Sequence, residues 1–122
     1  MRVGELLRIL PLENLTTSLS DQLDATVSGG YASDLLSDVL ANAGADAVLV
    51  TIQAHVNTIA VALHARLSAV ILSGDHRPEP SVIERAVDER IPLLVSSLPT
   101  FEIVGRLYAA GLSGIDKGGG AQ

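Results

Sequence analysis

Glycines and polar side chains that could bind a ligand follow each of four apolar segments in the sequence. Their hydroxyl, amide, imidazole, carboxylate and guanidinium groups suit an anionic or nucleotide-like metabolite. In chain order the candidates are Ser28, Gly29 and Gly30; Asp34; Gln53, His55 and Asn57; Gly74, Asp75 and Arg77; and Ser96, Ser97 and Thr100. In an open parallel sheet, ligands bind beyond the carboxyl ends of the strands. We therefore predict a shared binding crevice at that edge.

Arg77 is the best candidate for holding a phosphate or carboxylate, because its planar guanidinium can donate two parallel hydrogen bonds. Alternatively, Arg77 pairs with Asp75 or Glu79 in a solvated loop. His55 precedes a predicted helix, where it could donate to an anion or cap the helix. Asp34 could accept from a ribose hydroxyl, although helix capping is the simpler role. Turn formation alone also explains polar residues and glycines in such loops.

The sequence contains no recognisable catalytic or metal-binding pattern. A hydrolase or phosphoryl-transfer enzyme would have to use Ser97, His55 and Asp75, and no nucleophile elbow surrounds the serines. The glycine fingerprints of phosphate-binding loops are also absent. His55 and His64 fall on opposite faces of one predicted helix, and the chain has no cysteine. We expect no catalytic residue, no metal and no cofactor.

The apolar pattern predicts the elements that position these residues. Strand-length apolar segments alternate with segments whose apolar residues recur at helical spacing. The predicted strands span 25–28, 47–52, 69–72 and 91–95, with a further short strand at 15–17; the predicted helices span 3–10 or begin near Ser33, Val56, Ser81 and Thr100. Such alternation implies βαβ units and a parallel sheet. We predict an α/β three-layer sandwich, with a mostly parallel sheet of four or five strands flanked by helices.

The helical spacing also predicts which residues face the core. These are Leu35, Leu36, Val39, Leu40 and Ala43 in the second helix, Val56, Ile59, Ala60, Leu63 and Leu67 in the third, and Phe101, Val104, Tyr108 and Leu112 in the last. Ser81 and Glu84 fit a capping box at the start of the fourth helix.

The length of 122 residues is enough for one compact domain. We assign residues 1–112 to that domain and the glycine-rich residues 113–122 to a flexible tail. A net charge of −6 with scattered basic residues argues against nucleic-acid binding. No apolar run approaches the length of a membrane span, and the absence of cysteine fits a reducing compartment. We expect a cytoplasmic protein without nucleic-acid or membrane partners.

Several blocks of the sequence resemble the DRTGG domain family. They are residues 30–37 (GYASDLLS), 53–57 (QAHVN), 59–62 (IAVA), 77–80 (RPEP) and 91–96 (IPLLVS). The similarity runs from about Val27 to Leu112 and is particularly like the stand-alone DRTGG proteins that accompany iron-only hydrogenase and redox-regulation genes. The resemblance implies an α/β domain, often a homodimer, with a regulatory or ligand-sensing role and no established catalytic residues.

The sequence departs from the motif that names the family. Gln53-Ala54-His55 stands where relatives carry Gly-Asp-Arg, and Ser73-Gly74-Asp75 stands where they carry Thr-Gly-Gly. Gly74 is retained, so the turn can still form. The replaced Asp and Arg mean that the ligand of larger relatives does not follow from the motif.

Three functional hypotheses follow from the sequence. The first is a non-catalytic regulatory domain that binds a small anionic or nucleotide-like metabolite as a homodimer, in hydrogenase or redox regulation. The second is an interaction module that dimerises or docks a redox or kinase partner, because the chain is rich in aliphatic residues for its size. The third, a hydrolase or phosphoryl-transfer enzyme, has the least support.

Overall fold

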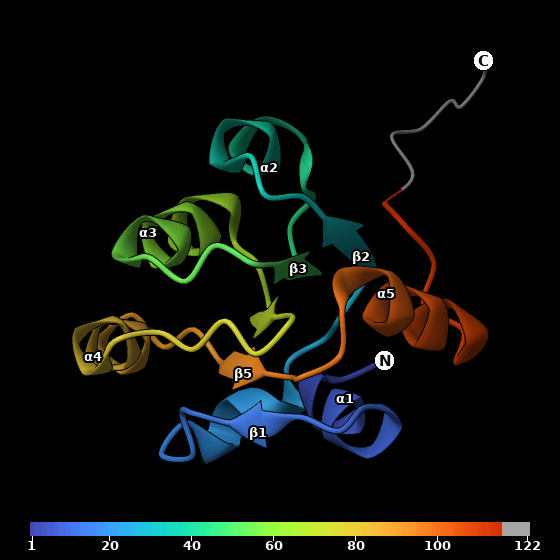
Figure 1. Ribbon diagram of the computed structural model, residues 1–122, viewed down its shortest axis with the longest axis horizontal. Coiled ribbons are helices and arrows are strands. Elements are labelled where there is room, and N and C mark those ends of the chain that lie inside the picture. The colour runs from blue at the N-terminus through green and yellow to red at the C-terminus, as the bar shows by residue number, and fades with distance from the viewer. Residues whose placement is uncertain (116–122) are drawn as a thin grey trace.

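A computed structural model describes residues 1–115, and Figure 1 shows how helices and strands alternate along the chain. The helices are α1 (Val3–Ile9), α2 (Leu36–Asn42), α3 (Val56–Ala65), α4 (Pro80–Asp88) and α5 (Thr100–Ala109), with a short 3₁₀ helix, η1 (Ser20–Asp24). The strands are β1 (Glu13–Asn14), β2 (Gly29–Ala32), β3 (Ala47–Thr51), β4 (Ala69–Leu72) and β5 (Leu93–Val95).

The five strands form one sheet in the order β1-β5-β4-β3-β2. Strands β2 to β5 are parallel, and only β1 is antiparallel, with Glu13 opposite Val95. Every residue of β3, β4 and β5 is buried, as expected for parallel strands covered on both faces. The predicted α/β class with a mostly parallel sheet is confirmed.

Helices cover both faces of the sheet and create two apolar cores. Helices α2, α3 and α4 lie on one side, and α1 and α5 lie on the other (Figure 1). On the first side, Leu49 and Leu72 pack with Ile59 of α3. On the second side, Val48 and Ile71 belong to a core that includes α1 and α5. Neighbouring residues of each strand thus face opposite cores.

The first long strand lies later in the chain than predicted. Residues 25–27 pair with the chain start instead: the Val3 N–H donates to the Ala25 carbonyl (3.0 Å), and the Val27 N–H donates to the Met1 carbonyl (2.7 Å). Strand β2 begins at Gly29, in the glycine pair that the sequence suggests as a loop. A Cβ at Gly29 would lie 2.9 Å from the Ile115 side chain, so this glycine permits a close approach rather than a turn.

Residues 113–115 lie against β2. The Gly30 N–H donates to the Ser113 carbonyl (3.0 Å), and Gly30 and Gly114 form a parallel bridge. The remainder of the predicted tail, residues 116–122, lies outside the described residues. The short strand expected at 15–17 is also displaced, because the sheet pairing of β1 involves Glu13 and Asn14.

Two predicted helix features are wrong in detail. In α5 the buried residues are Ile103 and Leu107, whereas Phe101 is 90% exposed and Tyr108 is 63% exposed. Helix α4 begins at Pro80 with Glu79 as its N-cap residue, not at Ser81. Proline is favoured in the first turn because it has no N–H to leave unpaired there.

Some apolar residues expected to face the core are instead exposed. They are Leu35 and Leu40 of the second helix region and Val56 and Leu63 of the third. The core positions are taken by Val39, Ile59 and Ala62, which are fully buried. Among residues 1–115, no helix is long and apolar enough to cross a membrane.

Candidate functional site

The carboxyl ends of β2 to β5 share one edge of the sheet because these strands are parallel. Most predicted site residues follow those ends and therefore lie along that edge. Ser28 is an exception, because it precedes β2, and its hydroxyl donates to the Ala45 carbonyl (3.0 Å). Gly29 and Gly30 lie within β2 itself. The prediction that Ser28, Gly29 and Gly30 lie in a loop at this edge is therefore wrong.

Asp34 holds the loop after β2 against the end of β3. Its Oδ1 accepts from the Thr51 hydroxyl (3.0 Å) and from the Ile52 N–H (2.9 Å). The Gln53 amide Nε2 donates to the Asp34 carbonyl (2.9 Å). Helix α2 has Leu35 as its N-cap residue, so Asp34 joins two loops and does not cap the helix. Asp34 and Gln53 thus act as structural links in this conformation.

The loops after β4 and β5 are joined in a similar way. The hydroxyls of Ser73 and Thr100 lie 2.6 Å apart. The Gly74 N–H donates to the Leu98 carbonyl (2.8 Å), and the Asp75 N–H donates to the Ser96 carbonyl (2.8 Å). These hydrogen bonds hold the two loops together beyond the carboxyl ends of β4 and β5.

Ser96 and Ser97 differ in their surroundings although they are adjacent. Ser96 is buried, and its Oγ accepts from the Leu98 N–H (3.1 Å). Ser97 is exposed beside it. The Ser96 side chain therefore stabilises its own loop, while Ser97 is available at the surface.

An open groove of about 460 Å³ lies between the starts of α3 and α4. It brings together three of the predicted residues, His55, Asn57 and Arg77. His55 is the N-cap residue of α3, and its side chain makes no capping hydrogen bond. The groove also includes Ser81, which the sequence suggests only as a helix-capping residue. Its place directly after Pro80, at the start of a helix, was the available signal.

Arg77 lies in this groove with two carboxylates beside it. Its Nη2 lies 2.7 Å from Glu13 Oε1, and its Nε lies 3.1 Å from Asp75 Oδ1. Glu13, and to a lesser degree Asp75, raise the pKa of the Arg77 guanidinium, which keeps it charged. The pair with Asp75 is one that the sequence predicts as an alternative to ligand binding. Glu13 belongs to β1, so its contact arises from the antiparallel pairing of β1 with β5.

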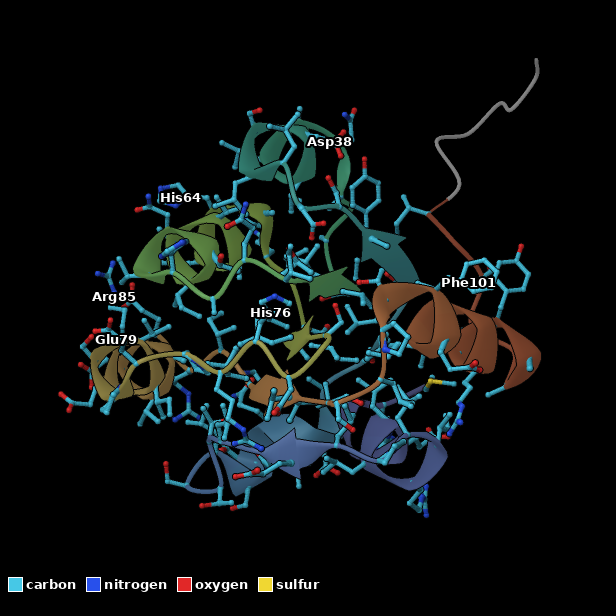
Figure 2. The ribbon with its side chains drawn as sticks, in the orientation of Figure 1. Asp38, His64, His76, Glu79, Arg85 and Phe101 are labelled. Carbon is cyan, nitrogen blue, oxygen red and sulfur yellow. The ribbon has the colours of Figure 1, made fainter. Side chains whose placement is uncertain are left out.

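His76 lies in the middle of the loop between β4 and α4, and Glu79 is its last residue. The His76 Nδ1 lies 2.8 Å from the Ser73 carbonyl, which keeps the ring close to the strand end. Figure 2 shows His76 near the middle of the sheet edge and Glu79 at the start of α4. Glu79 lines the groove, where its negative charge opposes that of an anionic ligand.

Metal binding finds no support in residues 1–115, which contain no group of three or more His, Cys, Asp or Glu residues able to hold an ion. His64 lies on α3, and its Nδ1 is 2.9 Å from the Ala60 carbonyl. His55, by contrast, precedes the first turn of the same helix.

The groove offers chiefly hydrogen-bond donors to a ligand. Arg77 supplies a permanent positive charge, Asn57 and Ser81 supply neutral donors, and His55 supplies a ring nitrogen. The first N–H groups of α3 and α4 have no partner within their helices, which favours negative charge at these helix starts. Such a surface can hold phosphate or carboxylate oxygens.

Comparison with known proteins agrees with this architecture. A family model described as the DRTGG domain matches residues 11–110. The comparison with curated proteins gives no match.

One similar solved structure contains the CBS and DRTGG domains of the regulatory region of Clostridium perfringens pyrophosphatase, complexed with its activator, diadenosine tetraphosphate. The TM-score is 0.65 at 14% sequence identity, so the likeness concerns the fold. It covers 92% of this chain and 47% of the other, so this protein spans about half the length of that regulatory region.

Proposed function

The chain belongs to the DRTGG domain family, and from that premise we propose that it is a non-catalytic regulatory domain that binds a small anionic or nucleotide-like metabolite. The observation that carries this proposal is the groove in which His55, Asn57, Arg77 and Ser81 meet. All four belong to the loops or helix starts beyond the carboxyl ends of parallel strands, where open α/β sheets bind ligands.

The nucleotide in the similar pyrophosphatase region supports the chemical class of this ligand. That protein is described with diadenosine tetraphosphate, a nucleotide with several phosphates, as its activator. A groove with one arginine and several neutral donors suits phosphate oxygens. The placement of such a ligand at Arg77 is part of our proposal for this chain.

Arg77 must exchange partners when an anion binds. In the described conformation Glu13 and Asp75 pair with its guanidinium, and the Arg77 side chain is 51% exposed. Exposed ion pairs are screened by water and contribute little to stability, so phosphate oxygens can replace one of them at small cost. The protein's net charge of −6 predicts that a divalent cation accompanying the phosphates would assist binding.

Ligand titrations followed by thermal unfolding test this proposal directly. We expect ATP or diadenosine tetraphosphate at millimolar concentration to raise the Tm of the wild-type protein, because a ligand that binds only the folded state stabilises it. Arg77→Ala should weaken the binding about tenfold or more, by loss of a charge-assisted hydrogen bond.

Arg85→Ala is the matched control for that titration. Arg85 lies on α4 outside the groove and pairs with Glu89 at 3.5 Å. This variant should bind as the wild type does. A wild-type protein whose Tm is unmoved by nucleotides, acyl phosphates and dinucleotides would contradict the proposal, as would equal losses in both variants.

A protein-interaction module is the second candidate function, in the form of a homodimer or of a domain that docks a redox or kinase partner. Exposed apolar side chains favour it, notably Phe101, Tyr108, Leu35 and Leu40. The link to hydrogenase or redox regulation is proposed from the family resemblance, and a cytoplasmic location is proposed from the absence of cysteine. Sedimentation of the protein alone and with cell extract would test whether it associates with itself or with others.

A further inference from the structure

Arg77 is bonded to two carboxylates that come from different parts of the fold. Asp75 belongs to the same loop, two residues earlier, and its Oδ1 lies 3.1 Å from Arg77 Nε. Glu13 belongs to β1 at the edge of the sheet, and its Oε1 lies 2.7 Å from Arg77 Nη2. Strand β5 lies between β4 and β1. The contact with Glu13 therefore spans one strand of the sheet and links the loop after β4 to β1.

These two contacts together occupy one binding face of the Arg77 guanidinium. Arginine commonly holds a carboxylate or a phosphate through two parallel hydrogen bonds, for which Nε and Nη2 form one suitable pair of donors. Here each of these two nitrogens is bonded to a different carboxylate. One positive charge thus lies beside two negative charges, and Glu79 adds a third negative charge to the groove. An incoming anion is therefore attracted to Arg77 only weakly until one carboxylate moves away.

Glu13 is the carboxylate better suited to leave. The backbone keeps Asp75 near Arg77, because the Asp75 N–H donates to the Ser96 carbonyl (2.8 Å) and the two residues share one loop. The Glu13 side chain is longer, is 57% exposed, and makes its contact from another strand. Rotation about its side-chain bonds is enough to release Arg77, with no change in the backbone of β1.

We propose that Glu13 is an internal competitor for the anion groove: it occupies Arg77 in the ligand-free protein, and a bound anion takes its place. This inference rests on the proposed function, because it concerns the same groove. Glu13 belongs to the same chain, so it competes at a fixed effective concentration, on the order of millimolar for flexibly tethered groups. Anions that bind weakly are thereby kept out. A ligand with several phosphates, which Asn57 and Ser81 can also bind, is able to displace it.

The fold does not depend on this ion pair, so the pair can be broken without unfolding the protein. Strand β1 is paired with β5 through its backbone, with Glu13 opposite Val95. The residues that follow are held by further bonds: the Leu15 N–H donates to the Leu93 carbonyl (3.0 Å), and the Leu93 N–H donates to the Thr16 hydroxyl (3.1 Å). Exposed ion pairs contribute little to stability. Variants of Glu13 should therefore fold with nearly the wild-type Tm.

Titration of ATP into the wild type and Glu13→Gln tests the competition. The amide keeps the length of the side chain and removes its charge, so it no longer competes with an anion for Arg77. We expect Glu13→Gln to bind ATP about two- to fivefold more tightly, the range for loss of one exposed ion pair. Glu84→Gln is the matched control, because Glu84 is exposed, lies on α4 outside the groove and carries the same charge. It should bind ATP as the wild type does.

Glu13→Asp separates competition from a general effect of charge. Aspartate keeps the negative charge at position 13 but is one methylene shorter, so its carboxylate does not reach Arg77 unless the backbone moves. Competition predicts that Glu13→Asp also binds ATP more tightly than the wild type. A general effect of charge predicts that it binds ATP as the wild type does.

NMR spectroscopy follows the displaced carboxylate directly. The carboxyl-carbon resonance of Glu13 should move when ATP is added to the wild type. It should move toward the position that it has in Arg77→Ala, where the ion pair is absent.

If the wild type binds ATP, three results would overturn the inference and leave the proposed function standing. They are a Glu13→Gln variant that binds ATP no more tightly than the wild type, a Glu13→Asp variant that matches the wild type while Glu13→Gln does not, and a Glu13 resonance that ATP leaves in place. If neither the wild type nor Glu13→Gln binds ATP, the proposed function fails and the inference fails with it.

Discussion

The Tyr31 hydroxyl illustrates how one contact makes stability depend on pH. It lies 2.8 and 2.9 Å from the two carboxylate oxygens of Asp38. This hydrogen bond, with smaller effects of burial and of the Asp38 charge, raises the pKa of Tyr31 above its ordinary value of 10.0. The folded protein thus holds the phenolic proton more tightly than the unfolded chain does. The hydrogen bond therefore stabilises the folded protein fully below about pH 10, and this contribution is lost as the pH rises through the raised pKa of Tyr31.

Asp38→Asn should lower the pKa of Tyr31 toward the ordinary value, because a neutral amide no longer opposes the tyrosinate. Ultraviolet absorbance of tyrosinate measures this in a Tyr108→Phe background, where Tyr31 is the only tyrosine. Asp88→Asn, which removes a carboxylate from α4, is the control and should leave the titration midpoint unchanged. An unchanged midpoint in Asp38→Asn would show that the contact does not govern the pKa.

At the same scale, the sequence predicts the position of individual side chains better than their partners. Arg77 follows β4, as predicted, and its pairing with Asp75 is one of the alternatives that the sequence leaves open. Its pairing with Glu13 depends on the position of β1 in the sheet, which no local pattern specifies. Asp34 likewise binds Thr51, a residue of another strand, in place of capping its own helix. Contacts between distant segments are determined by tertiary packing, and sequence spacing does not report them.

Among the elements, the turn after β4 depends on a backbone conformation that suits glycine. Gly74 has a φ of 63°, and the following Asp75 has a φ of 57°. A Cβ at Gly74 would lie 3.1 Å from the His76 ring. Gly74→Ala should therefore lower the free energy of unfolding by about 1–2 kcal/mol, through strain in the left-handed region.

Denaturant unfolding measures that loss, and Gly105→Ala gives the contrast at low protein concentration. Gly105 is helical and has open space around it, so alanine there should stabilise the folded protein by up to about 1 kcal/mol. If both substitutions changed the free energy of unfolding equally, the left-handed conformation at position 74 would carry no penalty for alanine.

The elements that the sequence predicts best are those with continuous apolar runs. Strands β3, β4 and β5 were located within one or two residues, because no helical alternation competes with a run such as 47–51. Strand β2 was placed too early because its glycines resemble a turn, whereas they admit Ser113 and Ile115 beside the strand. The buried face of α5 was misassigned because two stripes on this helix are apolar, and the more aromatic one contains Phe101 and Tyr108. Hydrophobic periodicity cannot say which of two apolar faces meets the core.

For the whole molecule, the central question is whether its two cores unfold together. Leu49 is fully buried on the side of α2, α3 and α4, and Ile71 is fully buried on the side of α1 and α5. Both belong to neighbouring strands of one sheet. Leu49→Ala and Ile71→Ala should each cost about 2–5 kcal/mol, and each should shift a single transition.

Circular dichroism of the helices and hydrogen exchange of the strand amides, followed through the same denaturant series, check this expectation. The exposed substitution Leu40→Ala should have little effect on either signal. If the two signals separate in Ile71→Ala alone, the layer formed by α1 and α5 is an independent unit.

The overall class of the fold followed from the alternation of strands and helices, since parallel βαβ units are the usual arrangement for that pattern. The order of the strands did not follow, and the antiparallel β1 at one edge is the clearest instance. Two residues of β1 carry too little pattern to be recognised as a strand.

The short segment after α5 has a consequence for solubility. Strand β2 is the last strand at its side of the sheet, and its Gly30 N–H is covered by the Ser113 carbonyl. Exposed strand edges can pair with other chains and lead to aggregates. A protein shortened to end at Gly111 would retain all five strands and yet lose this cover. We expect such a truncated form to precipitate on concentration, so fusion partners are better joined beyond Ile115.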